Sequence, residues 1–270
     1  MIQINSDKCV GCGSCIPVCP FDSIELKEAK AQFKPEAWCI DCFHCAAACP
    51  QEAIFRQGQA ASAGQIAPFS AGFGAELANL FKSRRSCRNF TAQPIPRQII
   101  EEALSLTTWA PTGCNEQGLK WLVVNDQDKL AEFARIMAGK TAETLPQVAQ
   151  MLARGINMIS GNASTLLVAY AENRPDRCFA QDAAIAAAYV ELWLRTQGLS
   201  SCWSGFTMIG ASRIPELKTE ILGLAEDDQV LAALMVGYPQ QQNYCNYPLR
   251  KPSKFKARLL REKVRIFLLF

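Results

Sequence analysis

Cysteine thiolates at short, regular intervals are the residues of this sequence whose spacing most directly indicates a chemistry. Eight of the 13 cysteines lie within the first fifty residues, in two copies of one pattern. The first copy comprises Cys9, Cys12, Cys15 and Cys19, and the second comprises Cys39, Cys42, Cys45 and Cys49; a proline follows each copy directly. Two-residue gaps let three successive thiolates surround one small iron–sulfur cluster, whereas the fourth cysteine points away from it.

The spacing therefore predicts two 4Fe–4S clusters, with the fourth cysteine of each run crossing to the other cluster. The predicted ligand sets are Cys9, Cys12, Cys15 and Cys49 for one cluster, and Cys39, Cys42, Cys45 and Cys19 for the second. Zinc is the alternative metal, but a zinc site needs only four ligands and no third cysteine at this interval. A disulfide framework is the other alternative, and the exact-length duplication without a secretory signal argues against it.

The two cysteine runs belong to an internal repeat of thirty residues, from Cys9 to Cys39. After each run, at residues 22–26 and 51–55, a short turn leads into a predicted strand. Trp38 and Phe43 are expected to pack around the second cluster and exclude water, and His44 is interpreted as an outer contact of the cluster or an exposed residue. Residues 1–56 resemble bacterial-type two-cluster ferredoxins.

A stretch without charged residues, rich in Gly, Ala and Ser, follows this segment. Such a change of composition is typical of a linker. We predict a ferredoxin domain over residues 1–56, a linker over 57–75, and a second domain with a basic C-terminal extension over 76–270. Gly72 and Gly74 have no third glycine at the required offset and no preceding strand, so they do not indicate a dinucleotide-binding loop.

Helical and strand patterns alternate through the second domain. Residues 121–124, 165–170 and 230–234 read as strands. The longest helix signal runs from Phe179 to Gln197. Its apolar stripe comprises Ile185, Tyr189, Leu192 and Trp193, and alanines occupy most other positions. This composition predicts either a central core helix or a subunit interface.

Three polar segments stand out in the second domain. Arg84, Ser86 and Arg88 alternate, so an extended backbone places two guanidinium groups and a hydroxyl on one side, which suits a phosphate. Residues 110–117 form a turn with amide and hydroxyl groups, and residues 247–252 form a basic turn. Each segment alone is also typical of solvated surface.

Together and in this order, these segments resemble the nitroreductase family of flavin enzymes. The resemblance is carried by residues 84–90 (RRSCRNF), 109–115 (WAPTGCN), 198–206 (GLSSCWSGF) and 236–239 (VGYP), and it extends over residues 77–252. It implies an α+β fold that dimerises through long helices. It also implies one FMN in each of two clefts at the dimer interface.

The resemblance assigns roles to individual residues. Arg84, Ser86 and Arg88 correspond to contacts of the FMN phosphate and ribityl chain, and Arg250 corresponds to a basic contact near the C-terminus. No catalytic acid–base pair is implied, because the flavin carries the electron transfer and the protein supplies position and shielding.

Further positions correspond to the flavin ring and to the partner subunit. Pro111, Thr112 and Asn115 match the loop that reaches the flavin of the other subunit. Gly205 matches a backbone position near the reactive edge of the ring, and Ser204 stands where many members have a carboxylate. Elsewhere in these motifs, Cys114 and Cys202 are interpreted as small buried side chains rather than redox groups.

The C-terminal residues 250–265 hold eight basic side chains and one acidic one, Glu262. We interpret this tail as a terminal helix or arm packed on the dimer. The alternative is a surface for an acidic redox partner, an anionic membrane or nucleic acid.

The predicted function is that of an iron–sulfur flavoprotein oxidoreductase of nitroreductase type. Electrons pass through two 4Fe–4S clusters to FMN and on to an organic acceptor such as a nitroaromatic or a quinone. An external ferredoxin, flavodoxin or NAD(P)H is the expected donor to the homodimer. The alternatives are an enzyme that works in the reverse direction and a redox sensor or electron carrier without steady turnover.

The composition sets the expected surroundings of the protein. Numerous cluster thiolates predict a reducing cytoplasm. A formal net charge of +3 is too small to indicate nucleic acid as the binding partner. The sequence contains no run of eighteen apolar residues, so we expect no transmembrane helix.

Overall fold

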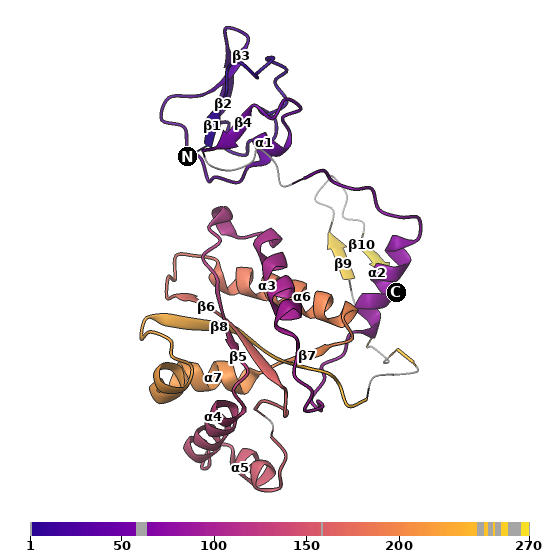
Figure 1. Ribbon diagram of the computed structural model, residues 1–270, viewed down its shortest axis with the longest axis vertical. Helices are drawn as coiled ribbons and strands as arrows, with labels where there is room; N and C mark the ends of the chain where they lie inside the picture. Colours follow the sequence, from indigo (N-terminus) through magenta and orange to yellow (C-terminus); the bar gives the residue numbers. More distant parts are fainter. Residues whose placement is uncertain are drawn as a thin grey trace.

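The computed structural model describes residues 2–57, 64–157 and 159–241, residues 246, 247 and 251, and the backbone of 255–258 and 266–269. Arg250, expected to contact FMN, lies outside the described residues. A small N-terminal domain stands beside a larger domain of helices packed on a sheet (Figure 1).

The N-terminal domain is built from two short antiparallel pairs and one helical turn. β1 (Ile2–Ile4) pairs with β4 (Ile54–Arg56), β2 (Ile24–Lys27) pairs with β3 (Lys30–Phe33), and α1 spans His44–Ala47. Ile24 and Ile54, thirty residues apart, are each 1% exposed and fill equivalent places in the core. The sequence repeat is therefore also a repeat of structure.

A four-stranded antiparallel sheet forms the centre of the second domain, in the order β5-β6-β8-β7. The strands are β5 (Lys120–Val124), β6 (Thr165–Glu172), β7 (Ser200–Trp203) and β8 (Asp228–Gly237). Leu166 and Val168 of β6 pack into one hydrophobic core, and Leu167 and Ala169 pack into another. Because side chains alternate along a strand, both faces of β6 are buried, which explains its almost continuous apolar sequence.

Helices cover both faces of this sheet (Figure 1). The α-helices of the second domain are α2 (Phe73–Ser83), α3 (Arg97–Ser105), α4 (Gln127–Lys140), α5 (Pro146–Ala153), α6 (Phe179–Thr196) and α7 (Gly205–Arg213). Short 3-10 turns occupy η1 (Leu106–Trp109) and η2 (Gly113–Asn115), and η3 (Leu217–Ile221) is a π-helical turn. The core on one face includes residues of α3 and α6, and the core on the other includes residues of α4, α5 and α7.

The α6 helix turns its small residues inward and part of its apolar stripe outward. Ala183 and Ala187 are fully buried in the core that includes the sheet and α3, and Ala186 is 1% exposed, whereas Tyr189 is 40% exposed and Trp193 is half-buried. Small inward side chains let the helix approach its neighbours closely. The outward apolar side chains of α6 are available to contact a second subunit, so the subunit-interface role of this helix stays a prediction.

The expected α+β class is confirmed. In the C-terminal tail the expected helix is wrong for the described backbone, because β9 (Phe255–Arg258) pairs antiparallel with β10 (Ile266–Leu269). The alternative of an arm packed on the dimer stays a prediction. Apolar and basic residues alternate over 255–258 (Phe, Lys, Ala, Arg), and this period of two is that of a strand. At the other end of the domain, α2 begins at Phe73, inside the expected linker.

Candidate functional site

Two small cavities in the N-terminal domain are each lined by four cysteines. One cavity is lined by Cys9, Cys12, Cys15 and Cys49, and the other by Cys19, Cys39, Cys42 and Cys45. The fourth cysteine of each run thus lies with the first three of the other run, as the spacing predicts. Their role as iron ligands stays a prediction.

Backbone N–H groups point at several of these sulfurs. Ala31 N–H donates to Cys9 Sγ, Asp41 N–H to Cys39 Sγ, and Ser23 N–H to Cys19 Sγ, each at 3.4 Å, and Ala53 N–H donates to Cys49 Sγ at 3.3 Å. Such hydrogen bonds stabilise a thiolate over a thiol and tune the potential of a cluster. The pockets are thus built for charged sulfur.

The donor sets fit a cluster better than a single ion. Within the described part of the chain, no three His, Cys, Asp or Glu side chains are grouped as one metal ion requires. A cubane cluster, by contrast, keeps its four ligand sulfurs apart on separate irons. Burial raises the pKa of the Cys45 thiol to about 11 and also raises that of Cys15, so a cationic partner is needed to hold these sulfurs as thiolates at neutral pH.

The first cysteine loop depends on a glycine. Gly11 has φ +69°, and a Cβ atom built there would lie 2.1 Å from the carbonyl oxygen of Ala29. Only glycine fits this approach, because no other residue lacks the Cβ atom. The loop between Cys9 and Cys12 is therefore fixed by backbone contact with the β2–β3 hairpin.

Aromatic residues around the second cysteine set differ partly from expectation. Phe43 is half-buried, and the Arg56 guanidinium lies 4.7 Å from its ring centroid. Trp38 lines the same cavity but is 62% exposed, so it does not shield the site as expected. Its ring packs against the ring of Phe21, with the two ring centroids 4.3 Å apart.

A cleft of about 530 Å³ in the second domain brings Arg88 and Gly205 together. Its lining also includes Asn89, Trp203, Phe206 and Met235. Gly205 is the first residue of α7, where the first N–H groups of the helix have no acceptor within the helix and Ser204 caps that of Thr207, and no atom lies within 4 Å of the Gly205 Cβ position. The cleft therefore combines a guanidinium, a helix N-terminus and apolar walls.

The segment before Arg88 is held in an extended conformation on β7. Ser86 forms a parallel bridge with Ser201, and Cys87 N–H donates to the Ser201 carbonyl at 3.0 Å. Ser86 and Arg88 are exposed and Arg84 is half-buried, so all three retain access to a ligand. The alternation expected from the sequence is thus supported by the backbone.

Sequence reasoning missed Glu191 of α6, which is 8% exposed behind this segment. Its carboxylate accepts hydrogen bonds from Ser201 Oγ at 2.7 Å, Trp203 Nε1 at 3.1 Å and Arg84 Nη1 at 3.4 Å. One buried charge thus positions a guanidinium and a cleft-lining indole. A carboxylate in an alanine-rich, buried helix was the signal, because buried acids require partners.

The loop over residues 110–117 is held by a second buried acid of α6. Asp182 is 3% exposed, and its Oδ1 accepts a hydrogen bond from Gly113 N–H at 3.0 Å. Thr112 Oγ1 accepts from Gln117 N–H at 3.2 Å, and Cys114 and Asn115 adopt left-handed backbone angles. Asp182, like Glu191, is an acid within the alanine-rich helix.

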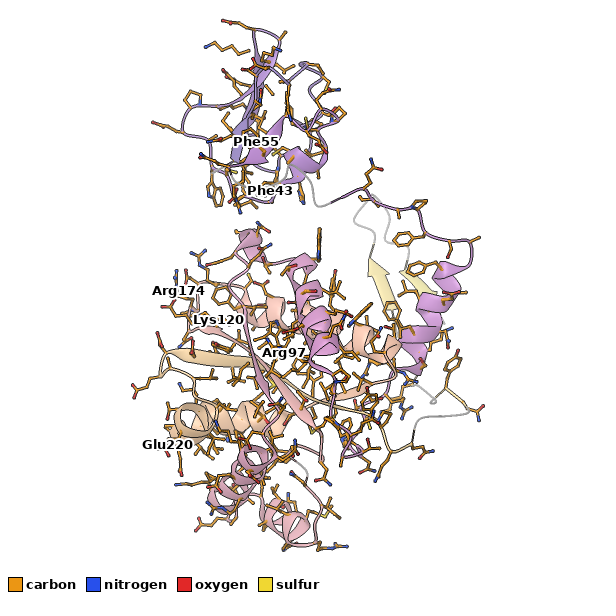
Figure 2. All side chains as sticks on the ribbon, in the orientation of Figure 1. Phe43, Phe55, Arg97, Lys120, Arg174 and Glu220 are labelled. Atoms are coloured by element: carbon orange, nitrogen blue, oxygen red, sulfur yellow. The ribbon has the colours of Figure 1, made fainter. Side chains whose placement is uncertain are left out.

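Asn115 contacts the N-terminal domain of its own chain. Its Nδ2 donates to the carbonyl oxygens of Asp41 at 3.0 Å and Ile40 at 3.3 Å, within the second cysteine run. Figure 2 shows Phe43 of that run on the side of the N-terminal domain that faces the second domain. Pro111, Thr112 and Asn115 do not line the cleft of Arg88 and Gly205 in the same chain.

The expectation of a buried side chain holds for one of the two cysteines in these motifs and fails for the other. Cys202 is 4% exposed, as expected of a buried side chain, whereas Cys114 is exposed and the expectation for it is wrong. Ser204 is 2% exposed and caps α7: its Oγ accepts from Thr207 N–H at 3.3 Å and lies 2.7 Å from the Ile159 carbonyl. Its hydroxyl therefore serves the helix terminus.

Comparison with known proteins bears on both domains. Residues 81–238 match the nitroreductase family, and residues 1–50 match the 4Fe–4S dicluster domain. Because the first match covers more than half of the chain, the protein belongs to the nitroreductase family, and it is an oxidoreductase of nitroreductase type with a dicluster ferredoxin domain in front.

Particular relatives match one domain each. A candidate NADH dehydrogenase/NAD(P)H nitroreductase of Archaeoglobus fulgidus is 27% identical over 171 residues, covering 62% of this chain and 87% of the relative. A ferredoxin of Pyrobaculum islandicum is 38% identical over 60 residues, 22% of this chain and 55% of that ferredoxin.

Solved structures share the fold of the second domain. A Bacteroides fragilis nitroreductase with bound FMN has a TM-score of 0.60 at 21% identity, covering 67% of this chain and 98% of that one. An FMN-dependent nitroreductase of Clostridium difficile has a TM-score of 0.54 at 21% identity, covering 67% and 100%. Separately, none of the helices in the described part of the chain combines the length and apolar character needed to cross a bilayer.

Proposed function

We propose that this chain is an FMN-dependent oxidoreductase that receives electrons through two 4Fe–4S clusters and passes them to a small organic acceptor. The observation that carries the proposal is the cleft shared by Arg88 and Gly205. Flavin sites need cationic donors for a phosphate, backbone N–H donors for the ring edge, and apolar walls for its faces. This cleft supplies each of them.

Of the residues expected to bind FMN, Arg88 and Gly205 line the cleft, whereas Arg84 and Ser86 do not line it. Arg88 is proposed to contact the phosphate. Ser86, two residues before it on the same extended segment, is proposed to contact the ribityl chain, and Arg84 is held by Glu191. The N-terminus of α7 at Gly205 favours negative charge at the edge of the ring. When bound, FMN supplies exchange between one-electron and two-electron carriers. The FMN-containing relatives of the same fold support this assignment.

Each cysteine cavity holds one 4Fe–4S cluster in the proposed protein. Four cysteines line each cavity, and N–H donors reach sulfurs of both sets. The match of residues 1–50 to a dicluster domain supports the presence of iron–sulfur clusters. Replacing Cys49 with Ala should disturb the cluster of Cys9, Cys12 and Cys15.

The active form is proposed to be a homodimer. The outward stripe of α6 presents half-exposed apolar side chains, including Tyr189. The loop of Thr112 and Asn115 lies apart from the flavin cleft of its own chain, so a second subunit is needed for it to reach a flavin. The thiolate-rich sites favour a reducing cytoplasm as its location.

Nitroaromatics and quinones are the proposed acceptors, and a low-potential ferredoxin or flavodoxin is the proposed donor, with NAD(P)H as the alternative. Anaerobically purified protein should contain about eight irons and one FMN per chain. Stopped-flow mixing should show a one-electron reductant reducing the flavin faster than NADH or NADPH. If NADH or NADPH reduces the flavin rapidly and a reduced ferredoxin does not reduce it, the proposed route through the clusters is contradicted.

A further inference from the structure

The two domains of the chain meet at the second cysteine run. Asn115 Nδ2 donates to the carbonyls of both Ile40 and Asp41, which lie between Cys39 and Cys42. Gln117 Nε2 donates to Asn115 Oδ1 at 3.3 Å, which orients the amide with its N–H groups toward those carbonyls. The Asn115 Nδ2 group thus makes the contact between the domains, and the Oδ1 atom fixes its orientation through Gln117.

The contacted peptide groups connect directly to cluster sulfur. Asp41 N–H donates to Cys39 Sγ at 3.4 Å, and the Asp41 carbonyl belongs to the peptide bond that joins it to Cys42. A short path of hydrogen bonds and covalent bonds thus runs from Asn115 to two of the sulfurs in one cavity. Hydrogen bonds that polarise peptides beside a cluster also tune its potential.

The two halves of the repeat in the N-terminal domain differ in the loop between the first and third cysteines of each run. Gly11 and Gly13 correspond to Asp41 and Phe43, and all four have positive φ. Where the first half has no side chains, the second has a carboxylate paired with Arg56 and a ring beneath the same guanidinium. The shared backbone is thus stiffened on the side of the domain that faces the flavin domain (Figure 2).

We propose that the cluster held by Cys19, Cys39, Cys42 and Cys45 delivers electrons to the flavin, and that Asn115 is the positioning residue of this transfer. The cluster of the other set then accepts electrons from the external donor. The assignment rests on the proposed function.

The transfer of electrons from the donor through the two clusters to FMN balances when the donor is a one-electron reductant. The donor gives two electrons, one at a time, and each cluster returns to its oxidised state after passing one on. Two such transfers, with two protons from solvent, fully reduce one FMN. The acceptor then takes the pair.

The decisive substitution is Asn115→Asp in the full-length, flavin-loaded protein. Aspartate is nearly the same size and tolerates the left-handed backbone, but its carboxylate cannot donate and faces two carbonyl oxygens. Asn173→Asp makes the same change of charge at an exposed position and is the matched control. Asn115→Gln keeps both donors and tests for rescue.

Two readouts are needed, both normalised to bound FMN. Rapid anaerobic mixing with sodium dithionite follows cluster and flavin absorbance separately, and hydrogen–deuterium exchange follows peptides covering residues 38–45. We expect Asn115→Asp to slow cluster-to-flavin transfer by about tenfold or more and to increase exchange, as loss of two hydrogen bonds at a docking contact predicts. Asn173→Asp should match wild type, and Asn115→Gln should recover part of the rate.

The outcomes separate the two proposals. If wild-type flavin is reduced without a lag behind the clusters, the cluster route itself fails, whatever Asn115 does. If wild type shows the lag and Asn115→Asp shows wild-type transfer and exchange, the assignment of the delivering cluster is overturned.

Discussion

Glu191 and Arg84 form an ion pair, with Nη1 and Oε1 3.4 Å apart, although 107 residues separate them in the chain. The pair joins the longest helix to the segment proposed to bind phosphate. The side chain of Glu191 is only 9% exposed and that of Arg84 is 31% exposed, so solvent screens the guanidinium more than the carboxylate.

Glu191→Gln should weaken both folding and FMN binding. The amide oxygen can replace one acceptor, but its NH₂ group then faces donors of Arg84, Ser201 or Trp203. We expect a loss of about 1–3 kcal/mol in the free energy of unfolding. FMN affinity should fall by about tenfold, equivalent to about 1.4 kcal/mol. Urea unfolding and a flavin titration measure the two effects, and unchanged affinity would contradict the positioning of Arg84.

Asp182 offers a paired test of the loop that carries Asn115. Asp182→Asn keeps an acceptor for Gly113 N–H. It also removes the charge of a carboxylate whose Oδ2 has no hydrogen-bond partner among the described residues, so it should cost under about 1 kcal/mol. Asp182→Ala leaves the Gly113 N–H without its acceptor and should cost about 2 kcal/mol. Thermal unfolding together with amide exchange over residues 110–117 checks both, and equal effects of the two variants would argue against the hydrogen bond.

Gly11→Ala should abolish stable iron binding at the first cysteine set. The new methyl group would lie 2.1 Å from the Ala29 carbonyl, and the positive φ adds about 1–2 kcal/mol of strain. Gly74→Ala is the control, because that glycine lies in α2 with nothing near its Cβ position, and the change should stabilise by about 0.5–1 kcal/mol. Iron content after anaerobic purification is the measurement; a full complement in Gly11→Ala would refute the steric argument.

The Cys202 thiol should resist alkylation until the pH is high. Burial raises its pKa above 9.0, and the Arg88 guanidinium and Ser86 hydroxyl offset only part of that rise. Because the folded pKa exceeds the unfolded one, the contribution of this thiol to stability is complete below pH 9.0 and is lost as the pH rises through the folded value. Mass spectrometry of iodoacetamide-treated holoprotein should find the exposed Cys114 and Cys178 modified before Cys202. Early labelling of Cys202 would contradict its burial.

The sequence was most informative where spacing is tied to covalent geometry or strand period. The cysteine intervals predict which sulfurs gather, and the apolar runs of β6 and β8 predict buried strands. The exposure of Cys114 and Trp38 was not predictable, because it depends on how loops pack rather than on residue type.

Long-range polar contacts were the main part of the site that local pattern could not supply. Glu191 and Asp182 act on segments 107 and 69 residues away, and periodicity carries no information on such pairs. The Asn115 contact is of the same kind: its motif indicated a flavin loop, but only the arrangement of the two domains brings it to Asp41.

The acceptors for Asn115 are main-chain oxygens. The two sides of the contact therefore differ in how well they tolerate substitutions. The two acceptors are carbonyl groups that every residue carries, so the ferredoxin side keeps them through any change of side chain that preserves the left-handed backbone of Asp41. The flavin side depends on one amide side chain. We therefore expect that a dicluster domain with the same backbone at positions 40 and 41 can take the place of this one, provided that Asn115 is kept.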